Sequence, residues 1–189
     1  MVVNEELAEH SDLDLVKLTL ENQENFLYLV QRYEKKLLRF IRRISGLNSD
    51  DAQDLLQEVF IKVYQNLNDF DQNLKFSSWL YRITHNQVVS NYRKNKSRPQ
   101  LSLFDLDLES CESLISDFDA SQNMDQKILR DKMSRALDGL DLKYKEVLVL
   151  KYLEDRSYEE ISDIIKKPTS TVGTLLSRAK KNLEKEFRQ

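Results

Sequence analysis

Apolar residues recur along most of the chain at the spacing of one helix face, i, i+3, i+4 and i+7. The periodicity begins after Ser11, which can act as an N-cap. Gly46 is a natural stop for a later helix, and Ser49 or Asp50 can cap the next one. In this first half the pattern predicts four helices, over residues 12–20, 23–44, 51–67 and about 77–94.

The pattern fades from residue 97 to about residue 123, where Ser, Asp and scattered Leu and Phe replace it. This stretch predicts a flexible linker, and a short amphipathic helix around 103–114 is the alternative. Four further helices are expected, over residues 124–140, 143–155, 157–166 and 169–187. The fold class is therefore all-α, with two small helical domains at 1–96 and 124–189 joined by the linker 97–123.

Composition supports this fold and narrows the chemistry. Three Gly and two Pro are too few for the tight turns of a β-sandwich or barrel. Cys111 is the single cysteine, and His10 and His85 lie far apart, so we expect no disulfide framework, metal or cofactor. The N-terminus lacks a signal-peptide pattern, and no apolar run reaches the ~20 residues that span a bilayer. We expect a cytoplasmic protein with no membrane insertion.

Charge is grouped by sign, although the formal net charge is only −3. Residues 32–43 carry six basic side chains against one acid, and residues 72–104 carry no acid. Residues 104–125 carry seven acids and no base, and the last 24 residues have a net charge of +5. Separated basic surfaces indicate two contacts with nucleic acid, and the acidic ones indicate a basic protein partner.

The last two expected helices have the layout of a helix-turn-helix. Ser157 and Glu160 have the spacing of a capping box, and Pro168 ends the first helix of the pair. The second helix has an apolar stripe made of Val172, Leu176, Ala179, Leu183 and Phe187. Its opposite face is small and polar at the start and basic further on, as a recognition helix requires. That face carries Ser170, Thr171, Thr174, Arg178 and Lys181.

The third expected helix also has two faces. Leu56, Val59 and Val63 lie on an apolar side that predicts core. Asp54, Gln57, Glu58 and Ile61 lie on the other side. That second face is either an ordinary solvated surface with one exposed Ile or a docking face for a partner helix. The spacing alone leaves both interpretations open.

Three segments together resemble the extracytoplasmic-function group of the sigma-70 family. "DAQDLLQEVFIKVYQNL" is similar to the segment that binds the RNA polymerase clamp helices, and "FSSWLYRITHNQVVSNYRK" to the segment that melts the promoter at the −10 element. "YLEDRSYEEIS" followed by "TVGTLLSRAKKNL" resembles the helix-turn-helix that reads the −35 element. The resemblance implies a non-enzymatic sigma factor whose partners are core polymerase (clamp helices and flap), promoter DNA and an anti-sigma factor.

The resemblance also implies roles for individual residues. Asp54, Gln57, Glu58 and Ile61 would dock on core polymerase, and the loop 68–76 would capture a flipped base. The −35 element would meet Ser170, Thr171, Thr174, Arg178 and Lys181. The −10 element would meet Asn73, Lys75, Phe76, Trp79, Arg82, Asn86 and Arg93.

Some features depart from the family or allow another interpretation. Gly173 and Leu175 stand where many members have Lys and Arg, which shifts the −35 contact toward Arg178 and Lys181. On a helical wheel Trp79 falls between the apolar side and the Arg/Asn face, so it is either core or a stacking platform. The alternative function is an autonomous helix-turn-helix regulator, which would bind DNA tightly without polymerase.

Overall fold

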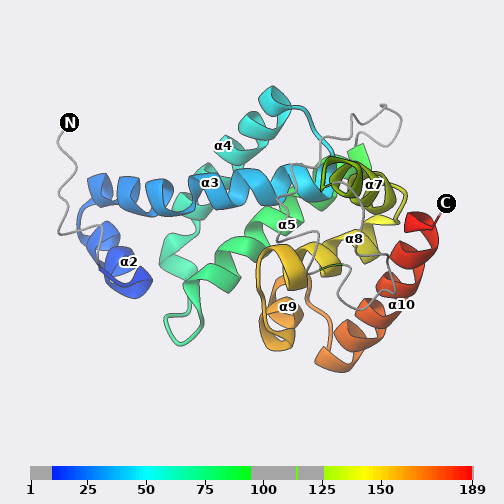
Figure 1. The fold of residues 1–189 in the computed structure, drawn as a ribbon. Coiled ribbons are helices and arrows are strands. Elements are labelled where there is room, and N and C mark those ends of the chain that lie inside the picture. The colour runs from blue at the N-terminus through cyan, green and yellow to red at the C-terminus, as the bar shows by residue number, and fades with distance from the viewer. Residues whose placement is uncertain (1–9, 95–113, 115–125, 189) are drawn as a thin grey trace.

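The computed structural model describes residues 10–94, 114 and 126–188, and the helices follow one another without any β-strand in these ranges (Figure 1). The N-terminal helices are α2 (Asp12–Glu21), η1 (Gln23–Asn25), α3 (Phe26–Ser45), α4 (Ser49–Gln65), η2 (Leu67–Asp69) and α5 (Phe76–Lys94). The C-terminal helices are α7 (Gln126–Asp138), α8 (Leu142–Leu148), η3 (Val149–Leu153), α9 (Tyr158–Ile165) and α10 (Thr169–Phe187). The all-α prediction is confirmed, whereas the predicted linker lies outside the described residues except for Leu114, which is buried.

Most helix ends lie where their capping residues predict. The Ser11 hydroxyl accepts a hydrogen bond from the Asp14 amide, and Gly46 ends α3 in the left-handed conformation at φ 67°. The predicted cap of α4 was wrong by one residue or two. The Asn48 side chain accepts from the Asp51 amide at 2.8 Å, because an Asn amide oxygen serves this role as well as Ser or Asp.

The helix predicted over 143–155 changes character in the middle. It is α-helical up to Leu148 and continues as the π-helix η3. In its last turn the Glu154 amide donates to the Val149 carbonyl, five residues earlier. The wider turn alters the direction in which the following residues point, an effect that the apolar spacing does not reveal.

The core follows the apolar stripes. Leu37, Phe40 and Ile41 of α3 are fully buried against α4 and α5, and the aromatic rings of Phe40 and Tyr81 lie 5.0 Å apart. In α10 all five stripe residues are buried, as predicted. None of the described helices combines the length and the apolar character needed to cross a bilayer.

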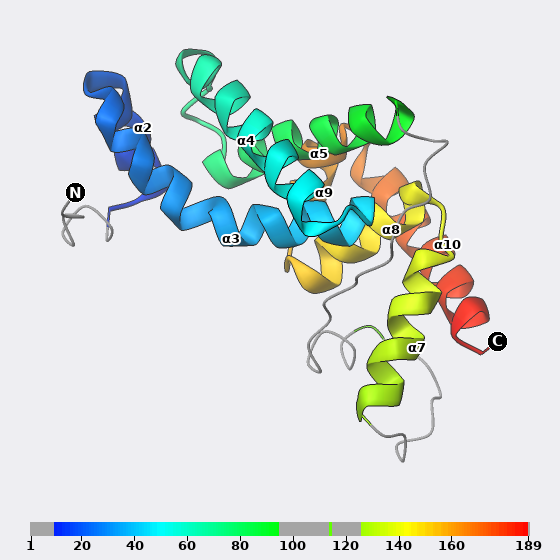
Figure 2. The same ribbon diagram turned by 90° about the horizontal axis from the view of Figure 1, so that it is seen from above.

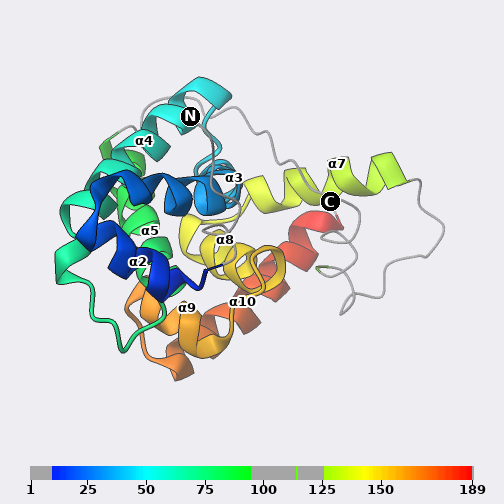
Figure 3. The same ribbon diagram turned by 90° about the vertical axis from the view of Figure 1, so that its left-hand side faces the viewer.

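The C-terminal helices pack against the N-terminal ones. α9 lies beside α5, and α8 and η3 contact α3 (Figures 1 and 2). α2 and α7 lie at opposite ends of the molecule, and α7 runs alongside α10 (Figure 3). The N-terminal helices, predicted to contact polymerase and the −10 element, therefore pack directly against the C-terminal helices, predicted to read the −35 element.

The capping box of α9 gives a first test of this local structure. The Ser157 side chain accepts from the Glu160 amide, and the Glu160 carboxylate accepts from the Ser157 amide at 2.9 Å. Replacing Ser157 with alanine should destabilise the protein by about 1 kcal/mol. The melting temperature should fall by about 2–4 °C in a thermal scan followed by circular dichroism. Ser177→Ala, at an exposed position inside α10, should leave it unchanged or slightly higher.

Candidate protein and nucleic-acid interfaces

The outer face of α4 is exposed and partly apolar. Asp54, Gln57 and Glu58 are solvent-exposed, and Ile61 has 57% of its surface accessible. The inner face carries the buried Leu56, Val59 and Val63 against α3 and α5. An exposed isoleucine one helical turn after Glu58 suits a partner helix that brings an apolar side chain and basic groups to this face.

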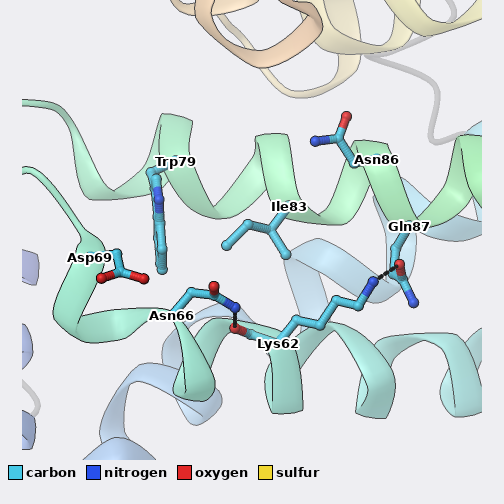
Figure 4. A pocket seen from close by; sticks show the side chains of 7 residues that line it. All are labelled: Lys62, Asn66, Asp69, Trp79, Ile83, Asn86 and Gln87. Atoms are coloured by element: carbon cyan, nitrogen blue, oxygen red, sulfur yellow. Dashed lines mark hydrogen bonds between the residues drawn. The ribbon is translucent and has the colours of Figure 1, made fainter.

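A cavity of about 280 Å³ lies between α4, η2 and α5 (Figure 4). Of the residues predicted to contact the −10 element, it is lined by Trp79 and Asn86. Asp69 comes from the loop 68–76 that was predicted to capture a flipped base, whereas the sequence did not single out the other lining residues, Lys62, Asn66, Ile83 and Gln87. The one-turn spacing of Lys62 and Asn66 on the side of α4 that faces α5 is the signal that could have identified them.

Most of the residues that line this cavity are polar, and hydrogen bonds among them and to Glu58 hold their side chains in place. Lys62 Nζ donates to Gln87 Oε1 at 2.5 Å, and the Asn66 side-chain amide donates to the Lys62 carbonyl at 2.7 Å. Gln87 Nε2 donates to Glu58 at 2.8 Å, which links the cavity to the outer face of α4. Amides, a carboxylate and a cation around an apolar floor can bind the edge of a nucleobase.

Two residues predicted to contact the −10 element are in the core. Phe76 has 2% of its surface exposed and Trp79 has 7%. Their rings lie 5.7 Å apart, and both pack on Phe70, at 5.4 and 5.2 Å. The structure thus places Trp79 largely beneath the surface, where its side chain forms part of the cavity wall.

The other residues predicted to contact the −10 element lie at the surface and are divided between two places. Asn73 and Lys75 are exposed in the loop before α5, and the Lys75 ammonium lies 3.2 Å from Glu160 of α9. Arg82 is half-buried, whereas Asn86 and Arg93 are exposed on α5. Asn86 and Arg93 also line a second groove, of about 620 Å³, which runs between α5 and the C-terminal helices.

The predicted −35 face of α10 is open to solvent. Ser170, Thr174, Arg178 and Lys181 are exposed, and Thr171 is half-buried. Pro168 starts the helix from extended backbone, and Lys166 turns the chain before it in a left-handed conformation at φ 53°. The tight turn leaves the first turn of α10 free to enter a groove of DNA.

The N-terminal helices match the model of the family Sigma-70 region 2 over residues 29–98, and the C-terminal helices match Sigma-70, region 4 over residues 130–183. The ECF RNA polymerase sigma factor SigW of Bacillus subtilis is 33% identical over 183 residues, covering 88% of this chain and 91% of SigW. The ECF RNA polymerase sigma-E factor of Escherichia coli K12 is 31% identical over 167 residues, covering 86% of each chain. The fold resembles that of the sigma factor RpoE from Bartonella quintana, solved with the anti-sigma factor NepR, with a TM-score of 0.66, 19% identity and coverage of 87% and 98%.

Proposed function

The chain belongs to the extracytoplasmic-function group of the sigma-70 family and directs RNA polymerase to promoters, and on that premise we propose how its surfaces divide the work. The observation that carries the assignment is the outer face of α4, where Ile61 is 57% exposed one helical turn after Glu58. An autonomous repressor has no use for such a face, whereas a factor that must bind polymerase requires one.

Polymerase docking is assigned to Asp54, Gln57, Glu58 and Ile61. Ile61 would bury its side chain against a helix of the polymerase clamp, which stabilises the complex by removing apolar surface from water. The carboxylates would meet basic side chains at the rim, where they contribute mainly to orientation and association rate. The hydrogen bond from Gln87 to Glu58 would transmit the docked position to the neighbouring cavity.

Strand opening is assigned to the cavity between α4 and α5 and to the surface beside it. An unpaired base costs a few kcal/mol to extract from the duplex, and a fitted pocket recovers part of that cost. Asn66, Asp69 and Asn86 line the cavity and would read the edge of the base. Arg82 and Arg93 of α5 would hold phosphates of the melted strand, and Asn73 and Lys75 would contact the strand from the loop before α5. Phe76 and Trp79 would support these surface residues from the core.

Recognition of the −35 element is assigned to the exposed face of α10. Ser170, Thr171 and Thr174 in its first turns would approach base edges in the major groove. Arg178 and Lys181 lie further along and would contact phosphates, which makes this contact dependent on salt. The corresponding division of the chain is 1–96 for polymerase and the −10 element and 124–189 for the −35 element.

Further partners follow from the same role. The flap of the polymerase would hold the C-terminal helices, and an anti-sigma factor would bind the free protein, as NepR binds the structural relative. Such a factor catalyses no reaction itself and acts only by binding its partners. It does so in the cytoplasm, where polymerase meets the chromosome.

Transcription in vitro tests the proposal. The protein is mixed with core RNA polymerase and a genomic template library, and run-off transcripts are sequenced. We expect transcripts that start at a common promoter motif only when both proteins are present. The protein alone should bind the same DNA weakly. Tight, sequence-specific binding without polymerase, together with no stimulated transcription, would instead support the autonomous regulator.

A further inference from the structure

The groove between α5 and the C-terminal helices is larger than the cavity beside Trp79, and most of its lining residues have no part in the surfaces assigned above. Its volume is about 620 Å³, against about 280 Å³ for that cavity. Binding sites for small molecules mostly measure about 300–1,000 Å³ and combine apolar walls with a few polar groups. The size of the groove is therefore that of a site for a small organic molecule.

Both sides of the groove offer apolar surface. Val89 and the ring of Tyr92 come from α5, and both side chains are half-buried. Leu142 of α8 and Ile165 of α9 come from the C-terminal helices. An aromatic ring beside aliphatic side chains is a surface on which a nucleobase or another flat ring packs well. The apolar part of the groove therefore suits a ligand that contains such a ring.

The charged part of the groove is mainly positive. Arg93 of α5, Lys143 of α8 and Lys167, which follows α9, all line it and are all exposed to solvent. Among the described residues, no acid pairs with Arg93 or Lys167. The Lys143 ammonium lies 3.3 Å from the exposed Asp141, whereas the lining acid Glu146 lies 2.9 Å from His85 Nε2. The groove thus has an excess of positive charge, which favours an anionic ligand.

A buried polar side chain completes the lining. His85 has only 8% of its surface exposed, and its Nε2 is held by the Glu146 carboxylate. Within the part of the chain that the structure describes, its Nδ1 is buried without a hydrogen-bond partner. Unpaired buried polar atoms are rare in folded proteins, because each one loses its hydrogen bonds to water. An imidazole left in this state beside a groove indicates a site for a polar ligand.

The groove is not a continuation of either proposed DNA contact. Lys143 and Lys167 belong neither to the residues assigned to the −10 element nor to those assigned to the −35 element. Asn86 and Arg93 are shared with the −10 contact, so an occupied groove would withhold them from the melted strand. That consequence rests on the proposed function, whereas ligand binding itself does not.

We propose that this groove binds a nucleoside polyphosphate. The base would pack against Tyr92 and the neighbouring aliphatic side chains, which removes apolar surface from water. The phosphates would lie between Arg93, Lys143 and Lys167. A guanidinium matches two phosphate oxygens at once, and the lysine ammonium groups add mobile positive charges. The two kinds of contact come from both sides of the groove, so a ligand that has both a base and phosphates fits it best.

A nucleotide titration of the full-length protein tests this site. ATP labelled with a fluorophore is titrated with protein, and binding is followed by fluorescence anisotropy. We expect saturable binding with a Kd below about 1 mM, which added salt weakens by screening. Unlabelled ATP or GTP should displace the probe. Adenosine and inorganic tripolyphosphate should each compete at least about tenfold less well, because each makes only one of the two kinds of contact.

Three variants place the binding in the groove. Lys143→Glu combined with Lys167→Glu should weaken ATP binding by at least about tenfold, because two attractions become repulsions. Ser90→Phe fills the groove from an exposed position of α5 and should abolish binding without changing the charge. Lys17→Glu is the matched control, since this exposed lysine of α2 does not line the groove. Circular dichroism verifies that each variant is folded.

Several results would overturn the site. They are absence of saturable ATP binding, unchanged affinity in both groove variants, and an equal loss in Lys17→Glu and in the double lysine variant. Competition by tripolyphosphate as strong as that by ATP would overturn the nucleoside part of the proposal. The titration contains neither polymerase nor promoter DNA. Promoter-specific transcription by a protein that fails to bind ATP would therefore refute the groove site and leave the proposed function standing.

Discussion

Replacing Ile61 with glutamate is expected to weaken binding of core RNA polymerase by at least about thirtyfold. Such a loss corresponds to the 2 kcal/mol or more by which central interface residues are recognised. The new carboxylate would have to be desolvated against the polymerase, next to Asp54 and Glu58. The fold should be unaffected, because Ile61 is 57% exposed and contributes little to the core. Titration of labelled protein with core polymerase, monitored by fluorescence anisotropy, gives the affinity.

Ile128→Glu is the matched control for this experiment. Ile128 has the same side chain and a similar exposure of 53%, but it lies on α7, away from the proposed docking face. We expect Ile128→Glu to lose far less affinity for core polymerase than Ile61→Glu, because it leaves the docking face of α4 intact. Equal affinities for both variants would show that α4 does not dock on polymerase, and equal losses would show that any added charge impairs binding.

Replacing Trp79 with alanine is expected to cost about 3–5 kcal/mol of folding free energy. The indole packs between Phe70 and Phe76 and is 7% exposed, so its removal leaves a cavity in the core of the N-terminal helices. The melting temperature should fall by about 10 °C. Urea unfolding followed by circular dichroism measures the change without relying on the fluorescence of the lost tryptophan, the only one in the chain.

Asn86→Ala separates stability from recognition in the same helix. Asn86 is exposed and lines the cavity in Figure 4, so its loss should change stability by less than about 0.5 kcal/mol. It should weaken binding of the polymerase complex to a single-stranded −10 oligonucleotide. If Trp79→Ala unfolded at the parent temperature while abolishing strand binding, Trp79 would be a stacking platform and the proposed supporting role would be wrong.

The sequence by itself determined the helices and their inner faces. The stripe from Val172 to Phe187 is buried as its spacing predicts, because a side chain's position around a helix follows from residue number alone. Caps such as Ser11 and the Ser157–Glu160 box act within four residues, so they too were readable. The exposed position of Ile61 followed from the same helical geometry.

Only the tertiary structure decided which helices and side chains pack against one another. The pair Arg43–Glu154 joins residues 111 positions apart, and no local pattern marks either as buried. Arg43 belongs to the basic block 32–43, yet it is buried in the contact between the N-terminal and C-terminal helices. The placement of Trp79 and the cavity beside it likewise depended on how α4 and α5 pack. Local spacing specifies the face of a helix, whereas partner choice arises from long-range packing that sums contributions from the whole chain.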